Sequence, residues 1–177
     1  ESLGSDLILQ CNATDEDDLA QTFSRLGDEW GKIDFVLHGI AFSHKDELKG
    51  RYVDTSPENF NVTLAASCYS FTAMCRHAQP FMAEGGSLIT LTYFGSEKVI
   101  PHYNIMGVAK AALDASVRYL AMDLGATGVR VNAISAGPVR TLASSAIGDF
   151  RYILKWNELN SPLGRNVSID EVGGAAV

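Results

Sequence analysis

Stretches typical of β-strands and α-helices alternate four times along this 177-residue chain, and this alternation restricts the fold more than any other feature. Apolar runs that favour strands cover 7–11, 33–38, 87–92 and 129–134. Stretches in which apolar residues recur at helical spacing cover 14–30, 57–83, 102–124 and 143–157. The pattern predicts an α/β fold, a doubly wound parallel sheet with helices on both of its faces.

Short polar motifs mark the starts of the predicted helices. Thr14, followed by acidic residues, predicts the N-cap of the first helix. Ser56 and Pro57 are a cap residue and a proline at the first helical position. Ser168, with Glu171 three residues later, predicts a further helix close to the last residue printed.

The positions of the outermost elements bear on domain organisation. A strand is expected almost at the first residue, and the helix after Ser168 has only about two turns before Val177. A helix this short is marginal alone. We therefore expect residues 1–177 to be the central part of a longer domain; a compact protein with frayed ends is the alternative.

Composition excludes several classes of protein. Fourteen Lys and Arg against 21 Asp and Glu give a net charge of −7, which argues against nucleic acid as a partner. No apolar stretch approaches the ~20 residues that a membrane span needs. The cysteines, Cys11, Cys68 and Cys75, have no CxxC spacing, so a reducing cytoplasm fits best. The four histidines include no i, i+4 pair, and we expect no metal site.

In parallel α/β sheets, ligands bind beyond the carboxyl ends of the strands, here 11–13, 38–46, 92–103 and 135–143. Tyr93 directly follows the third strand, and Tyr103, Met106 and Lys110 follow at helical spacing. Tyr103 and Lys110 then lie two turns apart on one face, roughly 10.5 Å along the axis. A phenol and an ammonium in one cleft can stabilise an oxyanion. An ordinary amphipathic helix explains the same spacing.

The segment after the fourth strand, 135–141, combines small residues with a proline and a threonine. Gly137 would let a ligand approach the backbone closely, and Pro138 would fix a turn. Thr141 offers a hydroxyl where a phosphate could lie. A generic loop is an equal explanation of this segment.

Taken together, these motifs resemble the short-chain dehydrogenase/reductase superfamily, and within it the enoyl-acyl-carrier-protein reductases of bacterial type II fatty acid synthesis. The resemblance runs from QCNATDEDD (10–18) through HGIAFS (38–43) to SIDEVGGAA (168–176). Most members of the superfamily carry Tyr-x-x-x-Lys. Here Met106 stands four residues before Lys110, and the tyrosine stands seven before it, which is the enoyl reductase pattern.

The resemblance implies a Rossmann-like fold and a reduction of trans-2-enoyl thioesters, the last step of the elongation cycle. Tyr103 matches the tyrosine that binds the thioester oxygen, and Lys110 matches the lysine that holds the nicotinamide ribose. Tyr93 matches the second active-site tyrosine, near the substrate. Met106 would line the acyl pocket, although an ordinary core position explains it nearly as well.

The same resemblance assigns contacts outside the catalytic helix. Phe42 and Ser43 match substrate contacts, and Ile40 matches a backbone contact to the cofactor. Asn12 and Ala13 match the pair that brackets the adenine, where many relatives have Asp-Val. The remaining cofactor contacts are expected from the loop of Val139, Arg140, Thr141, Leu142 and Ala143.

The resemblance also implies a cofactor and partners. The expected cofactor is NADH, with NADPH not excluded, because the glycine-rich turn and the residue that selects between them lie outside these residues. On this basis residues 1–177 are the central part of a single dinucleotide-binding oxidoreductase domain, without its N-terminal βα unit and C-terminal strand. An acyl-carrier protein would deliver the substrate to a cytoplasmic homotetramer. Another short-chain carbonyl or hydroxyl reductase and a non-catalytic cofactor-binding regulatory protein remain the alternatives.

Overall fold

The computed structural model describes residues 4–83, 85–141, 144 and 150–177. Three strands and seven α-helices are assigned within these ranges: α1 (Glu16–Trp30), β1 (Phe35–His38), α2 (Lys45–Leu48), α3 (Pro57–Leu64), α4 (Ser70–Ala78), β2 (Gly86–Thr92), α5 (Asn104–Leu124), β3 (Val129–Ser135), α6 (Phe150–Asn160) and α7 (Ile169–Ala176). The chain is an α/β protein, as the alternation of elements predicts.

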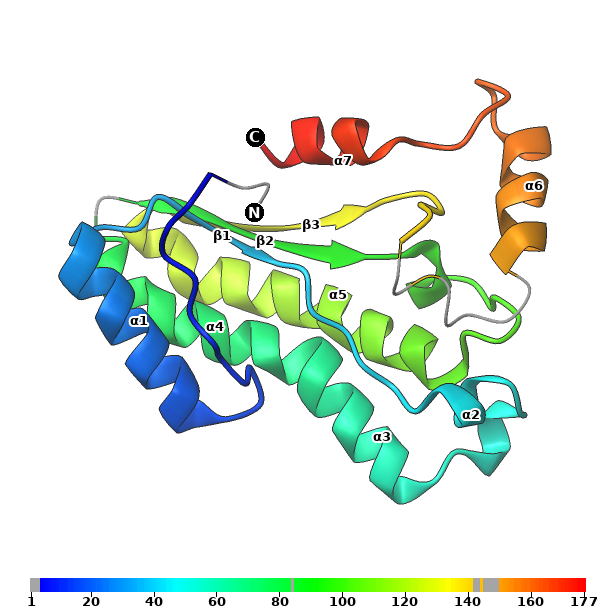
Figure 1. Ribbon diagram of the computed structural model, residues 1–177, viewed down its shortest axis with the longest axis horizontal. Coiled ribbons are helices and arrows are strands. Elements are labelled where there is room, and N and C mark those ends of the chain that lie inside the picture. Colours follow the sequence, from blue (N-terminus) through cyan, green and yellow to red (C-terminus); the bar gives the residue numbers. More distant parts are fainter. Residues whose placement is uncertain (1–3, 84, 142–143, 145–149) are drawn as a thin grey trace.

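The strands form one parallel sheet in the order β1-β2-β3. His38 is paired with Thr90, and Thr92 with Ser135, so the carboxyl ends of neighbouring strands meet along one edge of the sheet. Helices α1, α4 and α5 lie on one face of the sheet, and α7 runs across the other (Figure 1). The carboxyl edge faces the side of the molecule that carries α2 and α6 (Figure 1).

The main core lies between the sheet and the helices on its first face. Phe71 of α4, Leu88 of β2 and Leu113 of α5 are fully buried there. Leu19 and Phe23, one turn apart on α1, add to this cluster, because their spacing directs both side chains inward. This packing fixes α5 against β2, and it therefore fixes the side chains at the start of α5 relative to the carboxyl edge.

The expected strand at 7–11 is wrong: no strand is assigned to these residues, and Ile8 is 80% exposed. An apolar run becomes a strand only when its backbone finds a partner to pair with. The described sheet ends at β1 and does not pair with residues 7–11. The other three predicted strands are confirmed to within two residues.

The expected cap of the first helix is also corrected, by one residue. The N-cap of α1 is Asp15, whose carboxylate accepts hydrogen bonds from the backbone N–H groups of Asp17 and Asp18. The predicted caps at Ser56 and Ser168 are confirmed, and Ser168 and Glu171 form a capping box.

The helix expected over 57–83 is interrupted and ends early. A π-helical turn, Ala65–Tyr69, separates α3 from α4. The α-helix ends at Ala78, because Pro80 has no N–H to donate and the chain tightens into a 3₁₀ turn. The helix expected over 143–157 is observed as α6, over 150–160; its predicted start at 143 and residues 145–149 lie outside the described residues.

Candidate active site

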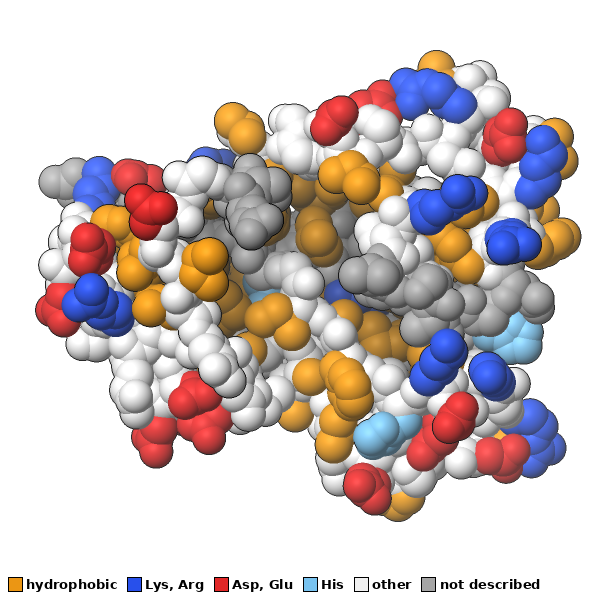
Figure 2. All heavy atoms as spheres, in the orientation of Figure 1, with side chains coloured by type: hydrophobic (Ala, Val, Ile, Leu, Met, Phe, Trp, Pro, Cys, Tyr) orange, Lys and Arg blue, Asp and Glu red, His pale blue; other side chains and the backbone are white. Residues whose placement is uncertain are grey.

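The carboxyl edge of the sheet opens into a cavity of about 680 Å³. Its walls come from the segments that follow the three strands, from the start of α5 and from α7. In the space-filling view the molecule is hollowed below α7, and hydrophobic side chains gather around the hollow (Figure 2). The cavity therefore lies where ligands bind in parallel α/β proteins.

Tyr93, Tyr103 and Lys110 meet in this cavity. Tyr103 stands at the N-cap position of α5, between two residues with left-handed backbone, His102 (φ 62°) and Asn104 (φ 36°). Its ring meets that of Tyr93 edge to face, with the ring centres 5.2 Å apart. Strained backbone of this kind clusters at functional sites, and here it holds Tyr103 in a buried position.

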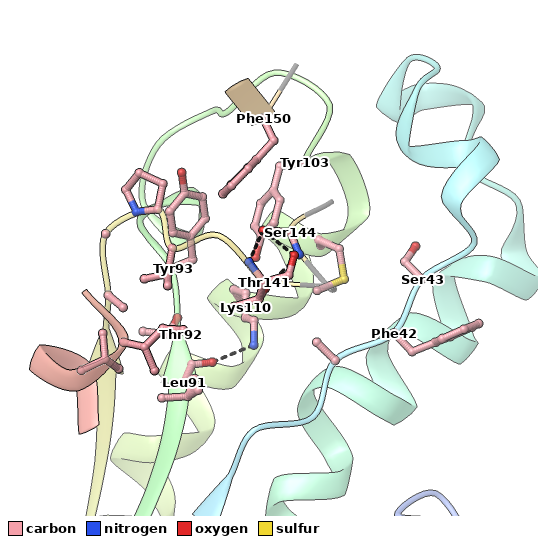
Figure 3. A pocket seen from close by; sticks show the side chains of 18 of the residues that line it. Phe42, Ser43, Leu91, Thr92, Tyr93, Tyr103, Lys110, Thr141, Ser144 and Phe150 are labelled. Carbon is pink, nitrogen blue, oxygen red and sulfur yellow. Dashed lines mark hydrogen bonds between the residues drawn. The ribbon is translucent and has the colours of Figure 1, made fainter. Parts of the chain in front are cut away.

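The Lys110 ammonium is anchored to the strand beside it. Its Nζ donates a hydrogen bond of 2.7 Å to the carbonyl oxygen of Leu91, near the end of β2 (Figure 3). Burial lowers the pKa of Lys110 to about 8, so the group is mostly protonated at neutral pH. Burial raises the pKa of both Tyr103 and Tyr93, so both phenols are neutral hydrogen-bond donors at that pH.

Two glycines allow the close packing around Tyr103. A Cβ at Gly95 would lie 2.5 Å from the Tyr103 ring, and one at Gly107 would lie 2.8 Å from the carbonyl oxygen of Gly95. Neither distance is compatible with a side chain. The 3₁₀ turn Phe94–Ser96 can therefore lie directly on α5, which brings Tyr93 to Tyr103.

A buried histidine ties the carboxyl end of β1 to its neighbours. His38 lies 2.8 Å from the hydroxyl groups of both Thr90 and Ser70. Ser70 donates its own proton to the carbonyl oxygen of Ala66, so its oxygen accepts from His38 Nε2–H, and Nδ1 accepts from Thr90. Burial, with a contribution from Lys110, lowers the pKa of His38 to about 4, which keeps the ring neutral.

The structure brings most of the predicted site residues together. The cavity walls include eight of them: Phe42, Ser43, Tyr93, Tyr103, Met106, Lys110, Val139 and Thr141. Phe42 and Ser43 lie across the site from Leu91 and Thr92 of β2 (Figure 3). Four others do not line it: Asn12, Ala13, Ile40 and Arg140. Leu142 and Ala143 lie outside the described residues.

The Asn12 side chain is already engaged. Its carbonyl oxygen accepts hydrogen bonds from the backbone N–H of Thr14, at 3.1 Å, and from the Thr14 hydroxyl, at 2.8 Å. An amide oxygen has two lone pairs, and Thr14 uses both. The resemblance implies that Asn12 brackets an adenine, and a hydrogen bond from the adenine amine to this oxygen would require Thr14 to release it.

Sequence reasoning missed the walls that come from other helices. The α7 residues Ile169, Val172, Gly173 and Ala176 line the cavity, as do Leu48 of α2 and Phe150 of α6. The α7 residues recur at the i, i+3, i+4, i+7 spacing of one helical face, so this wall was present in the pattern. Leu48 and Phe150 follow no spacing that points to the site.

The described part of the chain offers neither a metal-binding cluster nor a membrane span. Among these residues, no three or more His, Cys, Asp and Glu side chains are placed to hold a metal ion. The described helices also include none with the length and apolar character of a membrane span.

A parallel sheet that carries a tyrosine and a lysine of one helix at its carboxyl edge is typical of the short-chain dehydrogenase/reductase superfamily. A family model described as "Enoyl-(Acyl carrier protein) reductase" matches residues 1–177. The chain belongs to this family.

Individual relatives agree with the family model. "Enoyl-[acyl-carrier-protein] reductase [NADH] 1" of Rhizobium meliloti is 63% identical over the whole chain, which spans 65% of that relative's length. "Enoyl-[acyl-carrier-protein] reductase [NADH] FabI" of Rickettsia typhi is 55% identical over the whole chain, which spans 68% of it. The chain thus covers about two thirds of these relatives.

Solved structures show the same architecture. The enoyl-(acyl-carrier-protein) reductase of Anaplasma phagocytophilum, in complex with NAD, is 60% identical, with a TM-score of 0.94 over 99% of this chain and 67% of that one. The Bacillus cereus enoyl-acyl carrier protein reductase, with NADP+ and indole naphthyridinone, is 48% identical, with a TM-score of 0.95 over 99% and 68%. The predicted Rossmann-like fold is confirmed.

Proposed function

We propose that the protein reduces the trans-2 double bond of enoyl-acyl-carrier-protein thioesters with hydride from NADH, the last step of fatty acid elongation. Residues 1–177 would form the central part of one dinucleotide-binding oxidoreductase domain. The observation that carries the proposal is the shared cavity of Tyr103 and Lys110, with Met106 at the position that a tyrosine holds in most of the superfamily.

Tyr103 is proposed to stabilise the charge that develops on the thioester oxygen. When hydride adds to C3 of the enoyl group, negative charge moves to that oxygen as an enolate forms. The Tyr103 phenol is neutral and is held in a buried position, so it can donate a hydrogen bond to the thioester oxygen without reorganising. Preorganised donors of this kind stabilise a transition state most when they face the atom on which charge develops. Tyr93 packs against the Tyr103 ring and would orient it.

The residues around Lys110 fit a nicotinamide cofactor. An ammonium has three N–H donors, and the described structure assigns one of them to Leu91, so two can reach ribose hydroxyls. Small residues, Ala136 and Gly137, line the cavity nearby and would let a flat ring lie against the backbone. When bound, the cofactor would supply the hydride. The segment of Val139 and Thr141 would cover it.

The rest of the cavity suits an acyl chain. Phe42, Leu48 and Met106 offer apolar walls, of which Leu48 and Met106 pack with Tyr103, and Ser43 offers a polar group across the cavity (Figure 3). The apolar surface of an enoyl chain bound there would be removed from water, and its thioester would lie beside Tyr93 and Tyr103. Carbonyl and hydroxyl reductases of the superfamily are the alternative, and Met106 argues against them.

The carrier of the substrate, the oligomeric state and the cellular location are also part of the proposal. The relatives' names support an acyl-carrier protein as the carrier of the substrate and NADH as the cofactor. Association is supported by exposed Tyr119 and Met122, which lie near the end of the 21-residue helix α5 and would be covered in the proposed homotetramer. A cytoplasmic location is proposed from the class of the relatives.

An assay of the full-length protein tests the proposal. Loss of NADH absorbance, and separately of NADPH absorbance, is followed with a trans-2-enoyl thioester and with a panel of ketones. Turnover of the enoyl thioester is expected, with NADH preferred. Turnover of ketones alone would mean that the protein is a carbonyl reductase, and cofactor binding without any turnover would indicate a regulatory protein.

A further inference from the structure

Asn104, the residue after Tyr103, binds a segment that is distant in the sequence. Its side-chain Nδ2 donates to the carbonyl oxygens of Gly50 at 2.8 Å, Leu48 at 3.2 Å and Glu47 at 3.3 Å. An amide nitrogen has two N–H groups, so at least one is shared between two carbonyls. The start of α5 is thereby tied to the end of α2.

The same segment is held from the other side by α3. The carboxylate of Glu47 accepts from the backbone N–H and the hydroxyl of Ser56, at 2.9 and 2.8 Å. Fully buried Asn59 accepts from the backbone N–H of His44 at 2.9 Å and from the Ser43 hydroxyl at 3.2 Å. These bonds hold the whole segment 43–50 between α3 and α5.

This segment carries one wall of the cavity. Leu48 is buried, lines the cavity and packs in one cluster with Tyr103 and Met106. Asn104 binds the backbone of Leu48 on one side and adjoins Tyr103 on the other. Its carboxamide therefore joins the apolar wall to the tyrosine.

We propose that Asn104 is a positioning residue that fixes the Leu48 wall relative to Tyr103 and so determines which enoyl chains fit beside the tyrosine. The inference rests on the proposed function. Without the carboxamide, the 47–50 backbone loses three hydrogen bonds to α5, and the wall is free to shift. Cofactor binding, which uses Lys110 and the segment after β3, depends on none of them.

Asn104→Gly in the full-length protein is the decisive variant. Asn104 has a φ of 36°, which glycine adopts without strain, so the variant removes the carboxamide and keeps the backbone. From the net value of such hydrogen bonds, we expect the KM for the enoyl thioester to rise about tenfold. The KM for the cofactor should stay within about twofold, as no lost bond reaches it.

Chain-length preference gives a second readout. The kcat/KM values for four-carbon and twelve-carbon enoyl thioesters are compared in the wild type and in Asn104→Gly. Because a shifted wall changes how many methylenes fit, we expect their ratio to change at least about threefold. Asn104→Asp, which places a carboxylate against three carbonyl oxygens, should raise the KM further. Asn61→Asp makes the same change on the exposed face of α3 and should leave the KM unaltered.

The outcomes separate the two proposals. A wild-type protein that reduces no enoyl thioester overturns the proposed function. A wild-type protein that reduces it, with an Asn104→Gly variant whose KM and chain-length ratio are unchanged, overturns the role of Asn104 alone. An equal rise in the cofactor KM also overturns that role, because it would show that the whole site had loosened.

Discussion

The phenol of Tyr103 is the group on which the proposed chemistry depends most. Tyr103→Phe removes the hydroxyl and keeps the ring that packs against Tyr93. By comparison with other oxyanion donors, kcat on an enoyl thioester should fall about 100-fold or more. Dissociation constants for NADH, measured by fluorescence, should be unchanged. An unchanged kcat would remove Tyr103 from the chemistry.

The pKa of Lys110 predicts a pH dependence of cofactor binding. Burial lowers this pKa to about 8, so the ammonium is lost as the pH rises through that value. If the charged form binds the ribose, the Kd for NADH should rise by up to about tenfold per pH unit above 8. The Lys110→Met variant should bind NADH more weakly at pH 7, and its Kd for NADH should not change with pH. If the Kd values of the two proteins change with pH in the same way, Lys110 is not the group that binds the ribose.

The buried ring of His38 predicts a pH dependence of stability. Its pKa is about 4 in the folded protein and near 6.5 in the unfolded chain, so the unfolded state binds the proton first as the pH falls. The contribution of His38 to the free energy of unfolding is fully present above about pH 6.5. It declines as the pH falls towards 4, by about 3 kcal/mol in total. His38→Gln keeps hydrogen-bonding groups but does not titrate. Urea unfolding from pH 7 to 4.5 should show a shallower decline for the variant.

At the scale of residues, the sequence predicted the site residues that belong to a recognisable motif. Tyr103 and Lys110 share a cavity as their spacing predicts, because α5 is regular from Asn104 through Lys110, and Tyr93 joins them at the end of β2. The bond from Thr14 to the Asn12 carbonyl spans two residues, a local turn that asparagine favours, so the sequence offered a signal for it. The bond from Asn104 to Gly50 joins residues that are 54 apart and depends on loop paths that no local pattern encodes.

The contact between helix α5 and the 3₁₀ turn after β2 depends on Gly107. Gly107→Ala would place a Cβ 2.8 Å from the carbonyl oxygen of Gly95 and push the turn, with Tyr93, away from Tyr103. We expect a loss of about 1–3 kcal/mol in the free energy of unfolding and a lower kcat. Gly125→Ala at the other end of α5 meets nothing within 4 Å at a φ of −60° and should be neutral or stabilising. Equal effects of the two changes would contradict the packing argument.

At the scale of elements, periodicity and caps predicted most helices and strands, and the two main failures have different causes. The run at 7–11 has strand character but is not paired within the described sheet. The π-helical turn Ala65–Tyr69 lies inside a continuous helical pattern, and no residue type distinguishes it from a regular helix.

At the scale of the whole molecule, the exposed end of α5 predicts association. Tyr119 and Met122 are 76% and 82% exposed, although they are large apolar residues. We expect the full-length protein to sediment as a tetramer in analytical ultracentrifugation, and Met122→Glu to shift it to smaller species, because a charge would be buried at the interface. Arg151→Glu, at an exposed charged residue of α6, is the control and should leave the mass unchanged. A monomeric wild type at micromolar concentration would refute the tetramer.

The π-helical turn has a consequence for how this protein can change over evolution. Ser67, within the turn, binds both backbone polar groups of Phe42, and Ser70, directly after it, binds His38. The wide turn holds one residue more than a regular helical turn, so deleting a residue between Ser67 and Ser70 would restore a regular helix and leave the helix beyond it nearly in phase. The angle between the two serines would change, and they could not both keep their partners. The length of this stretch, and both serines, should therefore stay constant in related proteins.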